Sequence, residues 1–158
     1  LPSGIRLKLN AITNFKMIEK LYDASCQGVP IQMIVRGICC LIPGVKGMSE
    51  NIEVISIVDK YLEHPRVYMF ENAGDSKVYL SSADFMTRNI ENRVEVAVPI
   101  YDSILKQDIQ DVFEIAWNDN VKARKINGQE QNVFVKNGEE EIRSQWKIHD
   151  YYSKKRGE

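Results

Sequence analysis

The opening segment of the chain constrains the fold most strongly, because it predicts a strand, a helix and a second strand in close succession. Apolar and polar residues alternate over residues 5–12, which is the period-two pattern of a half-buried strand. Asn14 can cap the helix that follows, and Gly28 is placed to end it. Residues 31–35 form a short apolar run rich in branched side chains, which is typical of a strand buried on both faces.

Two strands joined by a helix in this way make a βαβ unit, whose strands run parallel. In sheets of this kind, ligands collect beyond the carboxyl ends of the strands. Arg36 follows the second strand directly, so we expect its side chain at the ligand-binding edge of the sheet.

The next part of the chain continues an α/β pattern. Residues 54–62 fit a helical stripe, which we favour, although the β-branched side chains of residues 52–58 would also suit a strand. Residues 67–70 and 77–81 flank a turn-rich stretch and predict a hairpin.

A further strand and a long helix are predicted after this hairpin. The alternation over residues 94–98 predicts a strand that places Arg93 and Glu95 side by side on one face. Residues 102–118 have the apolar stripe of a long amphipathic helix.

The end of the chain is more polar. Residues 121–126 and 133–135 predict a peripheral hairpin, and residues 139–155 predict a solvent-facing helix. Because the sequence contains no internal repeat and no low-complexity linker, we expect one domain with a peripheral tail.

The composition excludes several classes of protein. With 21 Lys+Arg against 22 Asp+Glu, the net charge is −1, so there is no global field to attract nucleic acid or an anionic membrane. No apolar run approaches the roughly 20 residues that a transmembrane helix needs. The 3 Cys residues include no CxxC pair, which argues against a disulfide framework or a zinc site and predicts a reducing cytoplasm. Because the first residue is Leu and not Met, we expect a piece of a longer protein.

Side chains suited to phosphate lie between residues 36 and 95. Arg36, His64 and Arg93 fall near predicted strand ends, together with two serines that follow the hairpin. Guanidinium groups pair with phosphoryl oxygens, hydroxyl groups donate to them, and an imidazole can move a proton or carry a phosphoryl group. Ordinary structural roles stay open as well: Arg36 in a surface ion pair, His64 as a structural residue, and Arg93 paired with Glu95 on a solvated face.

Six short segments in order along the chain carry a resemblance to a known family. They are IVRGICCLIPG at residues 34–44, GMSENI at 47–52, LEH at 62–64, FEN at 70–72, VYLSSAD at 78–84 and NRVEV at 92–96. Together they closely resemble the C-terminal catalytic domain of bacterial polyphosphate kinase. The resemblance runs from about residue 5 to residue 120 and weakens in the polar tail after about residue 124.

This resemblance implies an α/β fold of the phospholipase D type, with a mixed, largely parallel β-sheet flanked by helices. It assigns residues 1–125 to a phospholipase D-like catalytic domain and residues 126–158 to a polar C-terminal tail of that domain. The family makes inorganic polyphosphate reversibly from ATP with Mg²⁺, through a phosphohistidine intermediate. The phosphorylated histidine belongs to another catalytic domain, so we expect the chain alone to be inactive and the Mg²⁺ ligands to lie mainly outside it.

The resemblance also implies roles for single residues. Arg36 matches the family's nucleotide-phosphate-binding arginine, His64 its second active-site histidine, and Arg93 and Glu95 its active-site Arg-Val-Glu sequence. We therefore expect Arg36, His64 and Arg93 to bind the phosphates of ATP. His64, Arg93 and Glu95 are the expected catalytic residues, with Glu95 orienting either Arg93 or His64.

Two signature motifs of the phospholipase D fold occur in altered form. HPR at residues 64–66 resembles the HxK motif, and SSAD at residues 81–84 resembles the GSxN motif. The sequence leaves open whether Arg66, Ser81, Ser82 and Asp84 contact phosphate.

The partners implied by the resemblance are ATP and ADP, inorganic polyphosphate, the remaining domains of the same polypeptide and a second copy of the full-length protein. Nucleic acid is not an expected partner. The expected location is cytoplasmic, with peripheral membrane association of the full-length protein also open. Two alternative functions remain: a non-catalytic polyanion-binding module, and one half of a phospholipase D-type phosphodiesterase site.

Overall fold

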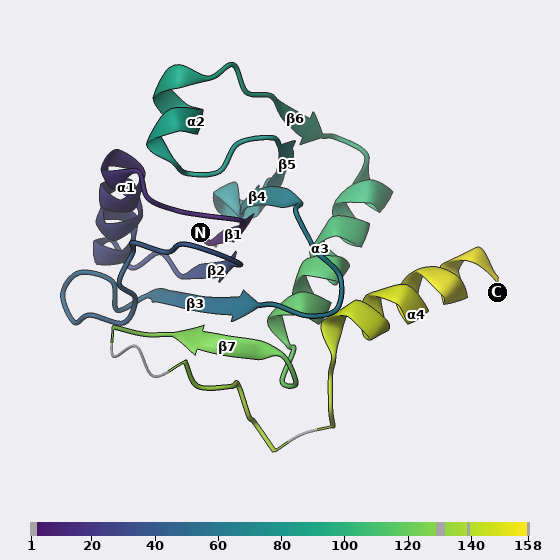
Figure 1. Ribbon diagram of the computed structural model, residues 1–158. Helices are drawn as coiled ribbons and strands as arrows, with labels where there is room; N and C mark the ends of the chain where they lie inside the picture. The colour runs from purple at the N-terminus through teal and green to yellow at the C-terminus, as the bar shows by residue number, and fades with distance from the viewer. Residues whose placement is uncertain (1–2, 129–131, 139, 158) are drawn as a thin grey trace.

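A mixed β-sheet forms the centre of the molecule, and helices lie on both of its faces (Figure 1). The computed structural model describes residues 3–128, 132–138 and 140–157. Within these residues the sheet has seven strands in the order β6-β5-β4-β1-β2-β3-β7. The strands are β1 (Ile5–Leu9), β2 (Ile31–Val35), β3 (Ile52–Ile57), β4 (Arg66–Phe70), β5 (Lys77–Ser81), β6 (Ala97–Ile100) and β7 (Ala123–Ile126). The helices are α1 (Phe15–Cys26), α2 (Thr87–Asn92), α3 (Ser103–Trp117) and α4 (Ser144–Arg156), with a 3-10 turn at Asn72–Gly74.

The predicted βαβ unit is confirmed. β1 and β2 pair in parallel, and β3 continues the parallel pairing beside β2. The side chain of Asn14 caps α1 by accepting the N–H of Met17 at 3.1 Å. After the helix, Gly28 has a φ of 81°, a left-handed conformation that glycine adopts without steric clash.

Two predictions about the sheet are wrong. The helix predicted over residues 54–62 is not formed, because Ile52–Ile57 form strand β3, which is the alternative that the β-branched side chains indicated. Its β-branched side chains are buried on both faces, with Val54 in the core on one side and Ile55 in the core on the other, as suits a central strand. The sheet is mixed, as expected, but it is not largely parallel. Among the six neighbouring pairs of described strands, only β1-β2 and β2-β3 are parallel.

The antiparallel half of the sheet follows from short connections. β4 and β5 form the predicted hairpin, and a hairpin connection allows only antiparallel pairing. The next strand, β6, begins at Ala97 instead of residue 94, so Arg93 and Glu95 lie in the loop that follows α2 and do not share a strand face. Just before β6, the N–H of Ser82 donates to the carbonyl of Val96 at 3.0 Å, and the N–H of Val96 donates to the Ser82 hydroxyl at 3.0 Å.

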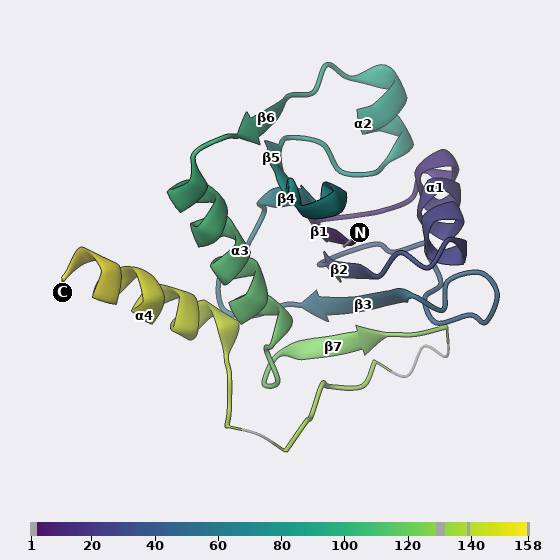
Figure 2. The same cartoon turned by 180° about the vertical axis from the view of Figure 1, so that it is seen from behind.

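Helices α1 and α3 lie on opposite faces of the sheet, as the two views show (Figures 1 and 2). Ile18 and Leu21 of α1 belong to the core on one face. Phe113 and Ala116 of α3 belong to the core on the other face. The long amphipathic helix predicted over residues 102–118 is therefore confirmed as α3, and burial of its apolar stripe fixes it to the sheet.

The polar end of the chain joins the main sheet. β7 pairs antiparallel with β3 at the sheet edge, and the N–H of Val135 donates to the carbonyl of Ala123 at 2.9 Å, as the predicted hairpin requires. α4 (Ser144–Arg156) overlaps the predicted helical stretch of residues 139–155 but begins later, at Ser144, and ends one residue beyond it. Residue 139 lies outside the described residues, as do residues 1–2, 129–131 and 158. β7 spans the predicted boundary after residue 125, and that division remains a prediction.

α4 packs against α3 and projects beyond the sheet (Figures 1 and 2). The hydroxyl of Tyr151 in α4 donates to the Asp111 carboxylate of α3 at 2.8 Å. At the start of α4, the buried Asp119 carboxylate accepts the N–H of Ser144 at 2.7 Å and that of Lys122 at 2.6 Å. No helix in the described ranges is long and apolar enough to cross a membrane.

Candidate functional site

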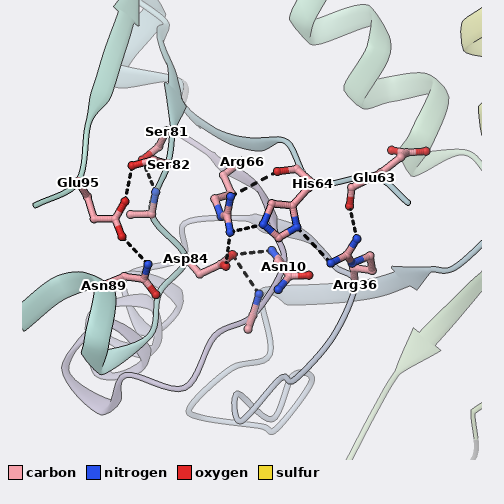
Figure 3. Close-up of polar contacts among 12 residues, drawn as sticks. Asn10, Arg36, Glu63, His64, Arg66, Ser81, Ser82, Asp84, Asn89 and Glu95 are labelled. Atoms are coloured by element: carbon pink, nitrogen blue, oxygen red, sulfur yellow. Dashed lines mark hydrogen bonds and ion pairs between the residues drawn. The ribbon is translucent and has the colours of Figure 1, made fainter. Parts of the chain in front are cut away.

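One edge of the sheet gathers the residues that the sequence singles out for phosphate chemistry. The carboxyl ends of the parallel strands β1 and β2 lie beside the start of the antiparallel strand β4 at this edge. Arg36 directly follows β2, and His64 lies two residues before the start of β4 (Figure 3). This is the position that the βαβ unit predicts for a ligand site.

Arg36 is fixed by both its backbone and its side chain. Its N–H donates to the carbonyl of Leu9 at 3.2 Å, and its own carbonyl accepts the Ser56 hydroxyl at 3.1 Å. The guanidinium donates through Nη1 to the carbonyl of Glu63 at 2.7 Å. Nη2 lies 3.1 Å from Nδ1 of His64. Arg36 and His64, two of the predicted site residues, are therefore in direct contact.

Gly37 allows the chain to turn sharply after Arg36. Its N–H donates to the carbonyl of Asn10 at 2.8 Å, and a Cβ on residue 37 would lie only 2.9 Å from that carbonyl oxygen. A side chain here would push the end of β1 away from the end of β2, so the RGICC sequence needs a glycine for close backbone approach.

His64 has a second guanidinium on its other side. Nη2 of Arg66 lies 2.7 Å from Nε2 of His64, and the same nitrogen donates to Oδ2 of Asp84 at 2.7 Å. The side chain of Arg66 is only 13% exposed and that of Asp84 only 2%. Figure 3 shows His64 between the two arginines, with Asp84 beside Arg66.

Asp84 is held in the charged form by its partners. Its Oδ1 accepts the N–H of Asn10 at 2.7 Å and of Ala11 at 3.1 Å, while Oδ2 accepts from Arg66. Burial alone would raise the pKa of the Asp84 carboxyl, but Arg66 and the two backbone N–H groups together hold it below its usual value. The pair also raises the pKa of Arg66. Asp84 thus ties β1 to the start of β4 and supports His64 through Arg66.

Glu95 belongs to a neighbouring polar cluster. Its carboxylate accepts the hydroxyl of Ser82 and, at 2.5 Å, the side-chain amide of Asn89 (Figure 3). These two hydrogen bonds, with the nearby charge of Arg93, lower the pKa of the Glu95 carboxyl. In the part of the chain that the structure describes, no hydrogen bond joins Glu95 to His64.

Arg93 lies in the exposed loop between α2 and β6. Within the described residues it makes no hydrogen bond or ion pair, although its charge attracts the Glu95 carboxylate. Its five N–H donors are thus available to an anion. The predicted side-by-side placement of Arg93 and Glu95 on a strand is replaced by neighbouring positions in one loop.

Several residues that support the site were not singled out from the sequence. Asn89 is buried in α2 and donates to Glu95. The carbonyl of Asn10 accepts the N–H of Gly37, and the N–H of Asn10 donates to the Asp84 carboxylate. The side chain of Gln145 in α4 makes two hydrogen bonds to the backbone of Tyr61, in the loop before His64. It accepts the N–H of Tyr61 at 3.0 Å and donates to its carbonyl at 2.8 Å. The signal for Asn89 is its place between the SSAD and NRVEV segments, whereas nothing in the tail's sequence indicates that Gln145 reaches this loop.

The site carboxylates do not form a metal-binding set. Within the described ranges, no group of three or more His, Cys, Asp or Glu side chains could hold a metal ion. Both oxygens of Asp84 and both oxygens of Glu95 already accept hydrogen bonds from protein groups. The described residues of the site therefore do not form a Mg²⁺ site by themselves.

Comparisons with known proteins give one consistent result. Residues 1–145 match the family model "Polyphosphate kinase C-terminal domain 2". Polyphosphate kinase from Escherichia coli (strain K12) is 54% identical over 152 residues, which cover 96% of this chain and 22% of that protein. The crystal structure of polyphosphate kinase from Porphyromonas gingivalis superposes with a TM-score of 0.94 and 43% identity, covering 97% of this chain and 24% of that one. The chain spans about a fifth to a quarter of the length of these relatives.

A more distant likeness concerns the fold. Nuc from Salmonella typhimurium, a phospholipase D family member, superposes with a TM-score of 0.60 at 17% identity over 79% of this chain and 82% of that one. The predicted α/β fold of phospholipase D type is therefore confirmed.

Proposed function

The chain belongs to the polyphosphate kinase family, in which it matches C-terminal domain 2, and from this membership we propose that it supplies half of an ATP:polyphosphate phosphotransferase site. The proposed reaction is the reversible transfer of the terminal phosphate of ATP to inorganic polyphosphate. The observation that carries the proposal is the contact of Arg36 with His64, at 3.1 Å, beyond the carboxyl end of β2.

Phosphoryl transfer depends mainly on positioned charge, so the arginines take the main role. Arg36 and Arg93 bind phosphoryl oxygens and neutralise the charge that develops on them. His64 donates a hydrogen bond or a proton to the bridging or leaving oxygen. Glu95, fixed by Ser82 and Asn89, orients Arg93 through the attraction of opposite charges. His64, Arg93 and Glu95 are the proposed catalytic residues.

The nucleophile and the metal are assigned to other parts of the kinase. The chain has 2 His residues, and we place the phosphohistidine outside it because the family resemblance implies that another catalytic domain carries the phosphorylated histidine. Mg²⁺ would meet its ligands outside this chain, and no step is derived through it. The chain alone is therefore expected to have no kinase activity.

The remaining partners follow from the same family membership. They are ATP and ADP, inorganic polyphosphate, the other domains of the kinase and a second copy of the full-length protein. A cytoplasmic location suits these phosphorylated substrates. No role in binding nucleic acid is proposed, because the net charge of −1 gives no basic surface field.

A purely polyanion-binding module is less well supported by the geometry. Such a module needs its arginines free, but the charge of Arg66 is matched by the buried Asp84 carboxylate. A phosphodiesterase half-site has only the likeness of the fold to Nuc in its favour.

The proposal is tested by histidine and arginine substitutions in a polyphosphate kinase that contains this domain. His64→Ala should abolish most ATP-dependent polyphosphate synthesis, and His149→Ala, at the exposed position, serves as the matched control.

Arg36→Ala should lower kcat/KM for ATP by about 10- to 100-fold, which corresponds to one lost charge-assisted hydrogen bond.

Equal activities of the two histidine variants would remove His64 from the site. Tight binding of polyphosphate with no effect of either His64→Ala or Arg36→Ala on turnover would instead support the binding module. Hydrolysis of a phosphodiester substrate by the intact protein would support the phosphodiesterase.

A further inference from the structure

The imidazole of His64 lies between two groups that can only donate hydrogen bonds. Its Nδ1 is 3.1 Å from Nη2 of Arg36, and its Nε2 is 2.7 Å from Nη2 of Arg66. A guanidinium has five N–H donors and no acceptor. A neutral imidazole has one lone pair and one N–H, so it can accept from one arginine and must turn its N–H toward the other.

The anchoring of the two arginines decides which contact is the hydrogen bond. Arg66 makes the shorter contact and is held by a 2.7 Å bond to Asp84. Asp84 is itself almost fully buried and fixed by the N–H groups of Asn10 and Ala11. Apart from its contact with His64, the Arg36 side chain is anchored, among the described residues, by one bond to the carbonyl of Glu63. Because Arg66 has the more rigid support, its N–H occupies the lone pair of Nε2.

We propose that Arg66, held by Asp84, is a positioning residue that keeps the lone pair of His64 on Nε2 and its proton on Nδ1. In this state Nδ1 of His64 and Nη2 of Arg36, which lie 3.1 Å apart, are both hydrogen-bond donors, and neither accepts from the other. They converge on the place where one phosphoryl oxygen of the nucleotide can accept from both. The identity of the acceptor, a nucleotide phosphate, rests on the proposed function. The tautomer of the His64 ring does not.

The two arginines therefore act differently, although both touch the same histidine. Arg36 is a ligand of the nucleotide phosphates, so its loss weakens substrate binding. Arg66 contacts the ring and not the substrate, so its loss affects the chemical step by letting the ring proton move to Nε2. Arg66 and Asp84, whose contact with phosphate the sequence leaves open, are thus assigned to the support of His64.

Nitrogen-15 NMR spectroscopy of the labelled chain, recorded without nucleotide at a pH at which both histidines are neutral, reads the tautomer directly. The two ring nitrogens differ strongly in chemical shift according to whether they carry the proton. For His64 we expect Nε2 to be the unprotonated nitrogen, which is the less common arrangement for an imidazole free in water. Arg36→Met should leave this pattern unchanged, whereas Arg66→Met should shift the ring toward protonated Nε2.

Kinetics in a polyphosphate kinase that contains this domain supply the second readout. Arg36→Met should mainly raise KM for ATP, and Arg66→Met should lower kcat by tenfold or more with a smaller change in KM. Arg66→Lys keeps the ion pair with Asp84 and should recover part of the kcat. It also serves as a folded variant if Arg66→Met proves unstable.

The results separate the tautomer from the proposed function. A protonated Nε2 in the unchanged chain, or a tautomer that follows Arg36 and not Arg66, overturns the inference whatever the reaction is. If His64 has the expected tautomer but the enzyme does not use ATP, the positioning role of Arg66 stands. Only the nucleotide phosphate is then ruled out as the acceptor. A KM effect of Arg66→Met equal to that of Arg36→Met would make Arg66 a phosphate ligand and overturn its role as a positioning residue.

Discussion

Asp84 is the residue that connects the stability of the domain to its site. Its carboxylate is 2% exposed and neutralises Arg66, which is 13% exposed. Asp84→Asn keeps the size of the side chain and its acceptor for the N–H groups of Asn10 and Ala11, but leaves the Arg66 charge without a counter-charge. The free energy of unfolding should fall by about 3 kcal/mol, as expected when one partner of a largely buried pair is removed.

Chemical denaturation measures this change, and Asp23→Asn is the control. The Asp23 side chain is 70% exposed and forms a surface ion pair with Lys20 of α1, so its replacement should change the free energy of unfolding by less than about 0.5 kcal/mol. Similar effects of the two substitutions would show that the Asp84 pair contributes no more than a surface contact.

The sequence identifies some site residues and not others for a physical reason. Arg36 is predictable because it directly follows a strand of a βαβ unit, where local geometry determines its position. The meeting of Arg36 with His64 involves residues that are 28 positions apart, so it depends on the antiparallel placement of β4 beside β1. Glu95 could not be assigned its partners from alternation alone, because β6 begins at Ala97 and Glu95 lies in the loop before it, bonded to Ser82 and Asn89.

At the scale of elements, the start of α4 fixes the loop that carries His64. Gln145 bonds both the N–H and the carbonyl of Tyr61 and also donates to the Glu63 carboxylate at 3.0 Å. Arg143 holds Asp59 through two hydrogen bonds of 2.8 and 2.6 Å. The polar tail thus contacts the loop at three alternate residues immediately before His64.

Gln145→Ala should therefore lower activity as well as stability. Loss of the hydrogen bonds to Tyr61 should lower the free energy of unfolding by about 1–2 kcal/mol and reduce kcat/KM of a polyphosphate kinase that contains this domain several-fold. Gln107→Ala, which removes an exposed glutamine of α3 bonded to Asp111, is the matched control and should change neither quantity appreciably. If the two variants have equal kcat/KM, α4 does not position the loop.

The elements also show where sequence patterns are decisive. α1 and α3 have clear apolar stripes, and helix propensity, capping and burial all favour the same structure. Residues 52–58 combine helical spacing with β-branched side chains, and the outcome depends on β2 and β7, which pair with β3 on either side. Tertiary pairing of this kind outweighs a local pattern.

For the whole molecule, two anchored carboxylates predict loss of stability in acid. Arg143 lowers the pKa of the Asp59 carboxyl, and the Asp84 carboxyl is also shifted below its ordinary value, as described above. A carboxyl with a lower pKa in the folded state stabilises the fold above its unfolded pKa, which is about 3.9 for Asp. This contribution is lost as the pH falls from about 4 through the folded pKa, because the folded state must then take up protons that the unfolded state already holds.

Denaturation measured at a series of pH values should show this loss below about pH 4. Asp84→Asn removes one of the two groups, so its free energy of unfolding should fall less steeply over the same range. A slope that is the same in the variant and the unchanged chain would mean that Asp84 titrates alike in the folded and unfolded states.

The strand order has a consequence for the way in which the sheet can be assembled. β1 occupies the middle, β2 and β3 follow on one side of it, β4, β5 and β6 extend the other side, and β7 is added beyond β3. Each strand in order of synthesis therefore joins a free edge of the strands already present, and none has to be inserted between two paired neighbours. A chain growing on the ribosome can build this sheet outward from its first strand without undoing an earlier pairing.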